Sequence, residues 1–128
     1  MSFFKNIFGE DKPNELPKIH WHYLESMAEL DDIENISFEK PVAIFKHSTR
    51  CSISRFSLRQ FEKEHTIEAD KLELYFLDLL ANRDISDAIE RRYQVQHQSP
   101  QLIVIKDGKA IYDASHSDIQ AESLQKFI

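Results

Sequence analysis

Short apolar segments alternate along the chain with longer segments in which hydrophobic residues recur every three or four positions. The first pattern is typical of strands and the second is typical of amphipathic helices. The strand pattern occurs at residues 19–23, 42–45, 72–77, 102–105 and 110–112. The helix pattern occurs at residues 24–33, 51–65, 85–93 and 117–128. The sequence therefore predicts the element order β-α-β-α-β-α-β-β-α.

The predicted helices also carry signals for their ends and for their buried faces. Asp84 is the expected N-cap of the third helix, and Ser117 with Gln120 has capping-box spacing at the last one. The side chains expected to face the core are Ile53, Phe56 and Phe61 in the second helix, and Ile119, Leu124, Phe127 and Ile128 in the last.

The strand at residues 42–45 is apolar at every position, which is typical of a strand covered on both faces. A polar strand-to-helix loop is expected at residues 46–50. After the strand at 102–105, Asp107-Gly108 predicts a hairpin, so that the next strand returns antiparallel. We therefore expect an α/β domain over residues 19–128 with a central mixed β-sheet flanked by helices. A thioredoxin-like fold requires this order, and other α/β arrangements share it.

Residues 1–18 are predicted to be an N-terminal arm outside this domain. An apolar start is followed by helix-breaking residues: Phe3, Phe4, Ile7 and Phe8, then Gly9, Pro13 and Pro17. We expect the arm to dock on the domain or to be partly disordered. The alternative is a weak contact with a membrane surface or a partner.

Composition narrows the function classes. The 128 residues suit one domain, and the net charge of −6 with no basic cluster argues against nucleic acid as a partner. The start of the chain lacks the pattern of a secretory signal, and no apolar run is long enough for a membrane span. A single cysteine cannot form an internal disulfide. A reducing cytoplasm is therefore the expected location.

That cysteine, Cys51, is the leading candidate for chemistry because it is placed where a buried strand gives way to a helix. The free N–H groups and partial positive charge of a helix N-terminus favour the thiolate over the thiol. Arg50, Lys46 and His47 add positive potential nearby. We therefore predict a reactive nucleophilic thiol rather than a buried cysteine that acts as a small hydrophobe.

Ser54 stands where a dithiol oxidoreductase carries the second cysteine of Cys-x-x-Cys. Its hydroxyl could donate a hydrogen bond to the Cys51 thiolate, or it could be an ordinary serine of the first helical turn. In either case Cys51 must form mixed disulfides with an outside partner, and another thiol must resolve them.

Other candidates lie on loops at the same expected edge of the sheet. In a thioredoxin-like fold, Ser99-Pro100 would hold a cis-proline beside the cysteine, where the backbone before it pairs with a substrate. His97 and His116, like His47, could orient or protonate a thiol, although each is more often a polar loop residue. The histidine pair at 20 and 22 has no third ligand nearby in the sequence, so no metal site is predicted.

Three separated segments, residues 46–54, 97–101 and 115–119, resemble the YtxJ-like monothiol bacilliredoxins, and the resemblance runs from Trp21 to the C-terminus. It implies a thioredoxin-fold thiol–disulfide oxidoreductase of the cytoplasm that serves bacillithiol, a low-molecular-weight thiol of some bacteria. The implied reaction removes bacillithiol from S-bacillithiolated protein cysteines. Cys51 would take over bacillithiol, and a separate thiol reductant would restore it. No bound cofactor is implied, because bacillithiol is a co-substrate.

The chain departs from that family's usual Thr-Cys-Pro-Ile-Ser motif at two positions. Arg50 stands where threonine is usual, and Ser52 replaces the proline. Arg50 could strengthen thiolate stabilisation, and Ser52 has a backbone N–H, which proline lacks, that could donate to sulfur. Two alternatives stay open: a non-catalytic thioredoxin-like module that binds a peptide, and a redox sensor in which Cys51 stores an oxidised or capped state.

Overall fold

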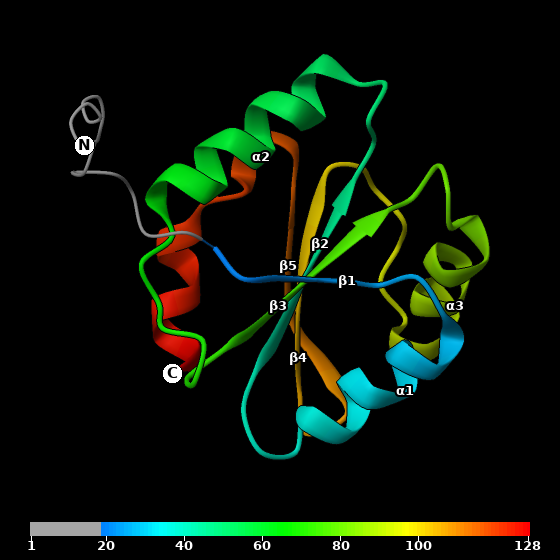
Figure 1. Cartoon of the computed structure of the whole chain (residues 1–128), viewed down its shortest axis with the longest axis vertical. Coiled ribbons are helices and arrows are strands. Elements are labelled where there is room, and N and C mark those ends of the chain that lie inside the picture. Colours follow the sequence, from blue (N-terminus) through cyan, green and yellow to red (C-terminus); the bar gives the residue numbers. More distant parts are fainter. Residues whose placement is uncertain (1–18) are drawn as a thin grey trace, which may run out of the picture.

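The computed structural model describes residues 19–128, which form a central sheet with helices on both faces (Figure 1). The elements in chain order are β1 (Trp21–Tyr23), α1 (Met27–Ile36), β2 (Val42–His47), α2 (Ser52–Glu64), β3 (Glu73–Asp78), α3 (Arg83–Tyr93), β4 (Gln101–Lys106), β5 (Lys109–Ser115), and the 3₁₀ helices η1 (His116–Asp118) and η2 (Ala121–Phe127). The predicted order is confirmed, apart from the form of the last helix. The expected arm at residues 1–18 lies outside the described residues, and the boundary at 18/19 stays a prediction.

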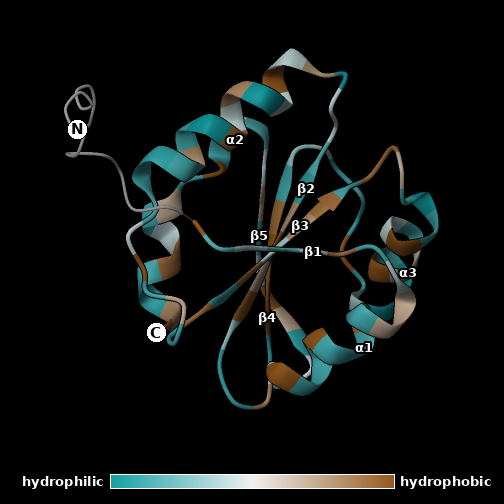
Figure 2. Cartoon of the chain, viewed as in Figure 1, coloured by the Kyte–Doolittle hydropathy of each residue, from teal (hydrophilic) through white to brown (hydrophobic). Residues whose placement is uncertain are grey.

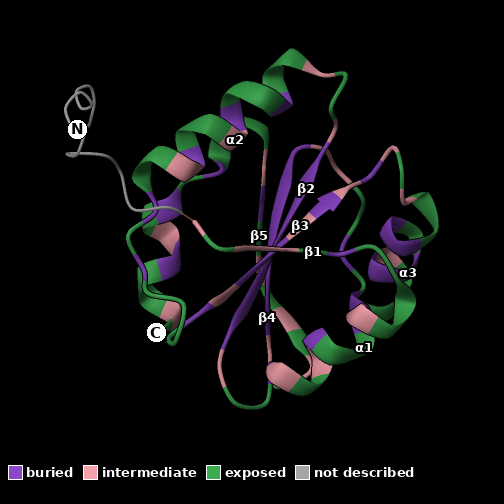
Figure 3. Cartoon of the chain, in the orientation of Figure 1, coloured by how far each residue is buried: buried purple, intermediate pink, exposed green. Residues whose placement is uncertain are grey.

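The strand order is β1-β3-β2-β4-β5, so that β2 occupies the centre of the sheet. It pairs in parallel with β3 and antiparallel with β4, which makes the sheet mixed, as predicted. All six residues of β2 are buried because helices cover both of its faces (Figure 3). The carboxyl ends of β2 and β3 meet at one edge, where His47 stands opposite Asp78.

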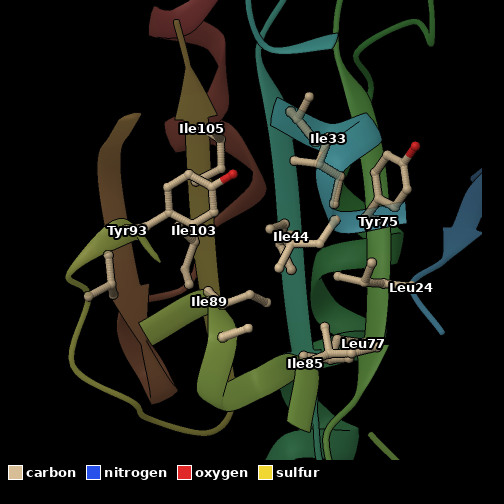
Figure 4. Close-up of a cluster of buried hydrophobic side chains, with 14 residues drawn as sticks. Leu24, Ile33, Ile44, Tyr75, Leu77, Ile85, Ile89, Tyr93, Ile103 and Ile105 are labelled. Atoms are coloured by element: carbon tan, nitrogen blue, oxygen red, sulfur yellow. The ribbon is translucent and has the colours of Figure 1, made fainter. Parts of the chain in front are cut away.

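Two apolar clusters lie on the two faces of the sheet. On one face, side chains of β2, β3 and β4 pack against α1 and α3, as Ile44, Ile33 and Ile89 illustrate (Figure 4). On the other face, Phe45 of β2 packs with Phe61 of α2 and with residues of η2. Successive side chains of β2 thus alternate between the clusters, as the pleat of a strand requires.

The buried face of α2 differs from the predicted one. Ile53 and Phe56 are 60% and 67% exposed, so the prediction that they face the core is wrong, whereas Phe61 is buried as expected. The buried positions at the start of the helix are Ser54 and Ser57. Ile53 and Phe56 therefore lie off the buried face that Phe61 shares, because Ser54, which hydrogen-bonds at the end of β2, takes the inner position of the first turn.

Both predicted helix caps are wrong. Helix α3 begins at Arg83 with Asn82 as its N-cap, so Asp84 lies within the first turn, where its carboxylate suits the helix dipole. The last segment forms two 3₁₀ helices because the chain is extended at Ile119 between them. Neither 3₁₀ helix has a side-chain cap. Ile119 and Leu124 are buried and Phe127 packs against the core, but Ile128 is half exposed, contrary to expectation.

Within residues 19–128, no helix combines the length and the apolar character that crossing a bilayer requires. Figure 2 accordingly shows hydrophilic residues over much of the helices.

The predicted hairpin between β4 and β5 is confirmed and is held by the end of α1. Asp107 and Gly108 both have positive φ, 54° and 76°. The Asp107 N–H donates to the Ser37 carbonyl oxygen at 2.7 Å, and the Gly108 N–H donates to Ser37 Oγ at 2.9 Å. A Cβ at position 108 would stand 3.0 Å from Phe38 Cζ, so the site favours glycine for both space and backbone conformation.

We predict that Gly108→Ala lowers the free energy of unfolding by about 1–2 kcal/mol, because alanine is strained at positive φ and would press on Phe38. Urea unfolding would measure the change. Lys109→Ala, at the exposed next position, is the matched control and should stay within about 0.5 kcal/mol of the wild type. Equal midpoints for all three proteins would contradict the argument.

Candidate active site

Cys51 is the N-cap residue of α2 and follows β2 after a short loop. Its backbone is extended (φ −108°, ψ 121°), and its side chain makes no capping hydrogen bond. The Cys51 N–H donates to the Ser48 carbonyl oxygen at 3.2 Å, and the Arg55 N–H donates to the Cys51 carbonyl oxygen at 3.0 Å. The half-buried thiol therefore sits at the helix end whose first N–H groups have no intrahelical acceptor.

Ser54 is fully buried and joins three parts of this region. Its Oγ is hydrogen-bonded to His47 Nδ1 at 2.8 Å and accepts from the Ser48 N–H at 3.1 Å. The first turn of α2 is thereby tied to the end of β2 and to the loop between them. Donation from Ser54 to the Cys51 thiolate stays a prediction.

The protonation of the His47 imidazole determines which acceptor the Ser54 hydroxyl proton can reach. Burial lowers the pKa of His47, since it disfavours the charged ring, although the Asp78 carboxylate partly opposes this. The neutral ring can hold its hydrogen on either nitrogen. If Nδ1 carries it, the Ser54 hydroxyl proton is free for sulfur; if Nδ1 is bare, that proton goes to His47. The tautomer of His47 therefore controls one hydrogen bond near the thiol.

The predicted polar loop begins later than expected, because Lys46 and His47 are the last two residues of β2 and both are buried. They point to opposite faces of the sheet. His47 contacts α2 through Ser54. Lys46 follows Ile44 onto the other face, where α3 supplies the nearby carboxylates Glu90 and Asp87. The contacts of Lys46 thus lie on the face opposite α2, and its stabilisation of the Cys51 thiolate stays a prediction.

Lys46 is instead the centre of a polar cluster with Gln101, which is buried like Lys46, and with His97, which is exposed. Its Nζ lies 2.7 Å from His97 Nδ1 and donates to Gln101 Oε1 at 3.1 Å. Ser86 Oγ of α3 lies 3.3 Å from the same His97 nitrogen. Burial lowers the pKa of Lys46 to about 8, while Glu90 partly opposes the shift. Burial and the Lys46 charge together lower the pKa of His97.

This cluster fixes the segment that leads into β4. Gln101 Nε2 donates to the Gln96 carbonyl oxygen at 3.0 Å, and Gln101 Oε1 accepts from the Gln98 N–H at 3.3 Å. The segment contains the Ser99–Pro100 bond, which is cis. The cluster therefore supports the Ser99-Pro100 backbone from the face opposite α2.

Ser99, Pro100 and His116 lie where β4 begins, at the edge of the sheet where β2 ends. The register places Gln101 opposite Lys46, so Pro100 comes next to the end of β2. The His116 N–H donates to the Pro100 carbonyl oxygen at 3.0 Å. Ser99 Oγ is buried, and no other residue of 19–128 hydrogen-bonds to it. His97 lies apart from these three residues, because its ring contacts Lys46 on the other face of the sheet; substrate binding by all four stays a prediction.

Arg50 and Ser52 flank the thiol and are exposed, as a route for a partner requires. Sequence reasoning missed two residues that shape this edge. Arg55 Nη1 donates to the Thr49 carbonyl oxygen at 3.2 Å and braces the loop. Gln101 is a polar side chain at the start of an apolar strand, and that contrast was the signal for its role.

His22 of β1 belongs to a different environment. His22 Nε2 lies 2.7 Å from Glu73 Oε1, and the other carboxylate oxygen of Glu73 pairs with Lys40 at 2.6 Å. Across residues 19–128, no three or more His, Cys, Asp or Glu side chains gather in a way that could hold a metal ion.

Comparison with known proteins agrees with this geometry. The family model described as monothiol bacilliredoxin BrxC matches residues 22–124. A solved structure of a candidate oxidoreductase with a thioredoxin fold is 31% identical, with a TM-score of 0.71 over 83% of this chain and 91% of that one.

Thioredoxins share the fold at lower identity. The Malassezia sympodialis thioredoxin is 20% identical, with a TM-score of 0.68 over 88% of this chain and 90% of that one. The Fasciola hepatica thioredoxin is 18% identical, with a TM-score of 0.62 over 82% and 93%. The thioredoxin-like fold predicted from the sequence is therefore confirmed.

We predict that Ser54→Ala lowers the free energy of unfolding by about 1–3 kcal/mol, because it leaves His47 Nδ1 and the Ser48 N–H without their buried partner. Ser57→Ala is the matched control: it removes a buried hydroxyl one turn later on the same helix. That control should be neutral or slightly stabilising, since alanine favours helix. If urea unfolding showed equal losses of unfolding free energy for both variants, the structural role given to the hydrogen bonds of Ser54 would be wrong.

Lys46 gives a pH prediction. Its pKa is lower in the folded state, about 8, than the usual 10.5, so the unfolded chain binds more protons between these values. The penalty for burying the charge is fully present below pH 8 and is lost as pH rises toward 10.5. Relative to Lys46→Met, the wild type should therefore gain on the order of 2 kcal/mol between pH 7 and 10. A constant difference in urea midpoints over that range would contradict the burial of a charged Lys46.

Proposed function

Because the chain belongs to the monothiol bacilliredoxin family, we propose that it removes bacillithiol from S-bacillithiolated protein cysteines through a mixed disulfide on Cys51. The family and the fold make it a thiol oxidoreductase of the thioredoxin class. The observation that carries the finer proposal is the position of Cys51, the only cysteine of the chain, at the N-terminus of α2. Such a thiol can accept an adduct but cannot release it by an internal disulfide.

The first step is a thiol–disulfide exchange. The Cys51 thiolate attacks the bacillithiol sulfur of the protein–bacillithiol disulfide, and a new S–S bond forms between Cys51 and bacillithiol. The old S–S bond breaks, and its electron pair leaves with the substrate cysteine, which takes up a proton. One disulfide is exchanged for another, so no external oxidant or reductant is consumed in this step.

The second step needs an outside thiol. Because Ser54 occupies the resolving position, the adduct on Cys51 waits for a separate reductant of the thiol class. Its thiolate attacks the bacillithiol sulfur, forms a disulfide with it and returns Cys51 to the thiolate. Bacillithiol is thus a co-substrate, and the proposal requires no bound cofactor. Turnover of this kind belongs to a reducing compartment, for which we propose the cytoplasm.

The surrounding groups have distinct proposed roles. The free N–H groups of the first turn of α2 stabilise the thiolate and the leaving sulfur, and the Arg50 guanidinium adds positive charge at the rim. The Ser52 N–H is one of these donors. Ser54 contributes its proton when His47 holds hydrogen on Nδ1. Ser99 and Pro100 present backbone to the substrate chain, and His116 sits beside them.

We predict that mixing the protein with a bacillithiolated substrate yields a bacillithiol adduct on Cys51 and a free substrate thiol, both visible by intact-protein mass spectrometry. Cys51→Ser should abolish transfer, whereas Ser57→Ala should keep it. Release of the substrate thiol by Cys51→Ser at the wild-type rate would refute the proposal. An adduct that forms once but that no added thiol removes would indicate a sensor instead of a catalyst.

A further inference from the structure

A row of cations runs along α2 from the reactive thiol. Cys51 and the cationic residues Arg55, Arg59 and Lys63 are spaced four positions apart, which places them in a continuous row that winds about 120° around a helix with 3.6 residues per turn. All three cations are exposed. No acidic residue occurs between positions 46 and 61, although the chain as a whole carries a net charge of −6 and Glu62 and Glu64 flank Lys63. We call these three cations the α2 stripe.

Arg55 and Arg59 do not serve the stability of the helix, whereas Lys63 lies in the last turn, where a cation suits the helix dipole. Like charges four residues apart each destabilise a helix by roughly 0.2–0.5 kcal/mol, and cations near its N-terminus oppose the dipole. Across residues 19–128, no carboxylate forms an ion pair with any member of the stripe. Only Arg55 has a structural contact, its hydrogen bond to Thr49. Within residues 19–128, Arg59 and Lys63 therefore have no carboxylate partner.

The surface beside the stripe is apolar. Ile53 and Phe56 are 60% and 67% exposed, and Phe56 lies three residues before Arg59, on the adjoining side of the helix. Exposed apolar side chains rimmed by charge are typical of a protein contact.

The length of the stripe indicates the kind of partner. At 1.5 Å per residue, Lys63 stands about 18 Å from Cys51 along the helix axis. A small thiol bound to Cys51 cannot span that distance. An extended peptide covers it with about five or six residues, since a strand rises about 3.3 Å per residue.

We propose that the α2 stripe docks an acidic segment of the protein whose cysteine is being freed, so that the domain selects cysteines with acidic residues near them in the chain. The inference rests on the proposed function and deepens it by naming the substrate class. The positive row steers an acidic partner toward the sulfur, and Ile53 and Phe56 supply apolar contact area beside it.

Two peptides test the proposal. They carry the same bacillithiolated cysteine and differ only in four flanking residues, glutamate in one and lysine in the other. Mass spectrometry follows the initial rate of adduct transfer to Cys51 in the full-length protein at low salt. The glutamate peptide should react about tenfold faster, and the ratio should fall toward one as salt screens the charges.

Arg59→Glu should reduce the ratio at least about threefold, and Arg59→Lys should preserve it. The control is Lys109→Glu, which makes the same change in net charge at the exposed hairpin end, where β5 begins. Equal rates for the two peptides would overturn the inference and leave the proposed function standing. Equal effects of the two glutamate variants would also overturn it, because net charge alone would then explain the preference. No transfer from either peptide would refute the proposed function itself.

Discussion

The hydrogen bond between His47 and Ser54 joins the central strand of the sheet to the helix that carries the thiol. The two side chains are buried, so their pairing is obligatory: either one left alone would be a polar group without water. Together with the Ser48 N–H, they fix where α2 starts and therefore where Cys51 stands. The exposed features of the site, from Arg50 to the far end of α2, take their positions from this buried contact.

On the other face of the sheet, β2 supports the segment that leads into β4. Lys46 follows the pleat of the strand toward α3, and its hydrogen bonds with His97 and Gln101 hold the segment before β4. Adjacent residues of one strand thus position the two backbone segments at this edge of the sheet. One is held through Ser54 of α2, and the other through the polar cluster of Lys46, His97 and Gln101. The alternation of side chains along a single strand couples both segments to the core.

The order of elements and the thioredoxin-like fold could be predicted because each strand and helix has a long, regular apolar pattern. The inner face of α2 could not, because ranking side chains by hydrophobicity places Ile53 and Phe56 inside and gives no weight to a serine with a buried partner. Lys46 and His47 resembled loop residues for the same reason. The burial of Lys46 depends on its contact with His97, which is distant in the sequence. The burial of His47 depends on its hydrogen bond with Ser54, which belongs to α2.

The full burial of Ser54 also bears on why this domain has one thiol. A cysteine differs from serine by a single atom, so a dithiol site is chemically close. That atom is the one on which His47 and Ser48 depend, and sulfur is both bulkier and a weaker hydrogen-bonding group. A cysteine at position 54 would therefore weaken the hydrogen bonds to His47 and Ser48 that hold the start of α2 in place. The external reductant that the proposed cycle requires would then follow from the architecture of the core.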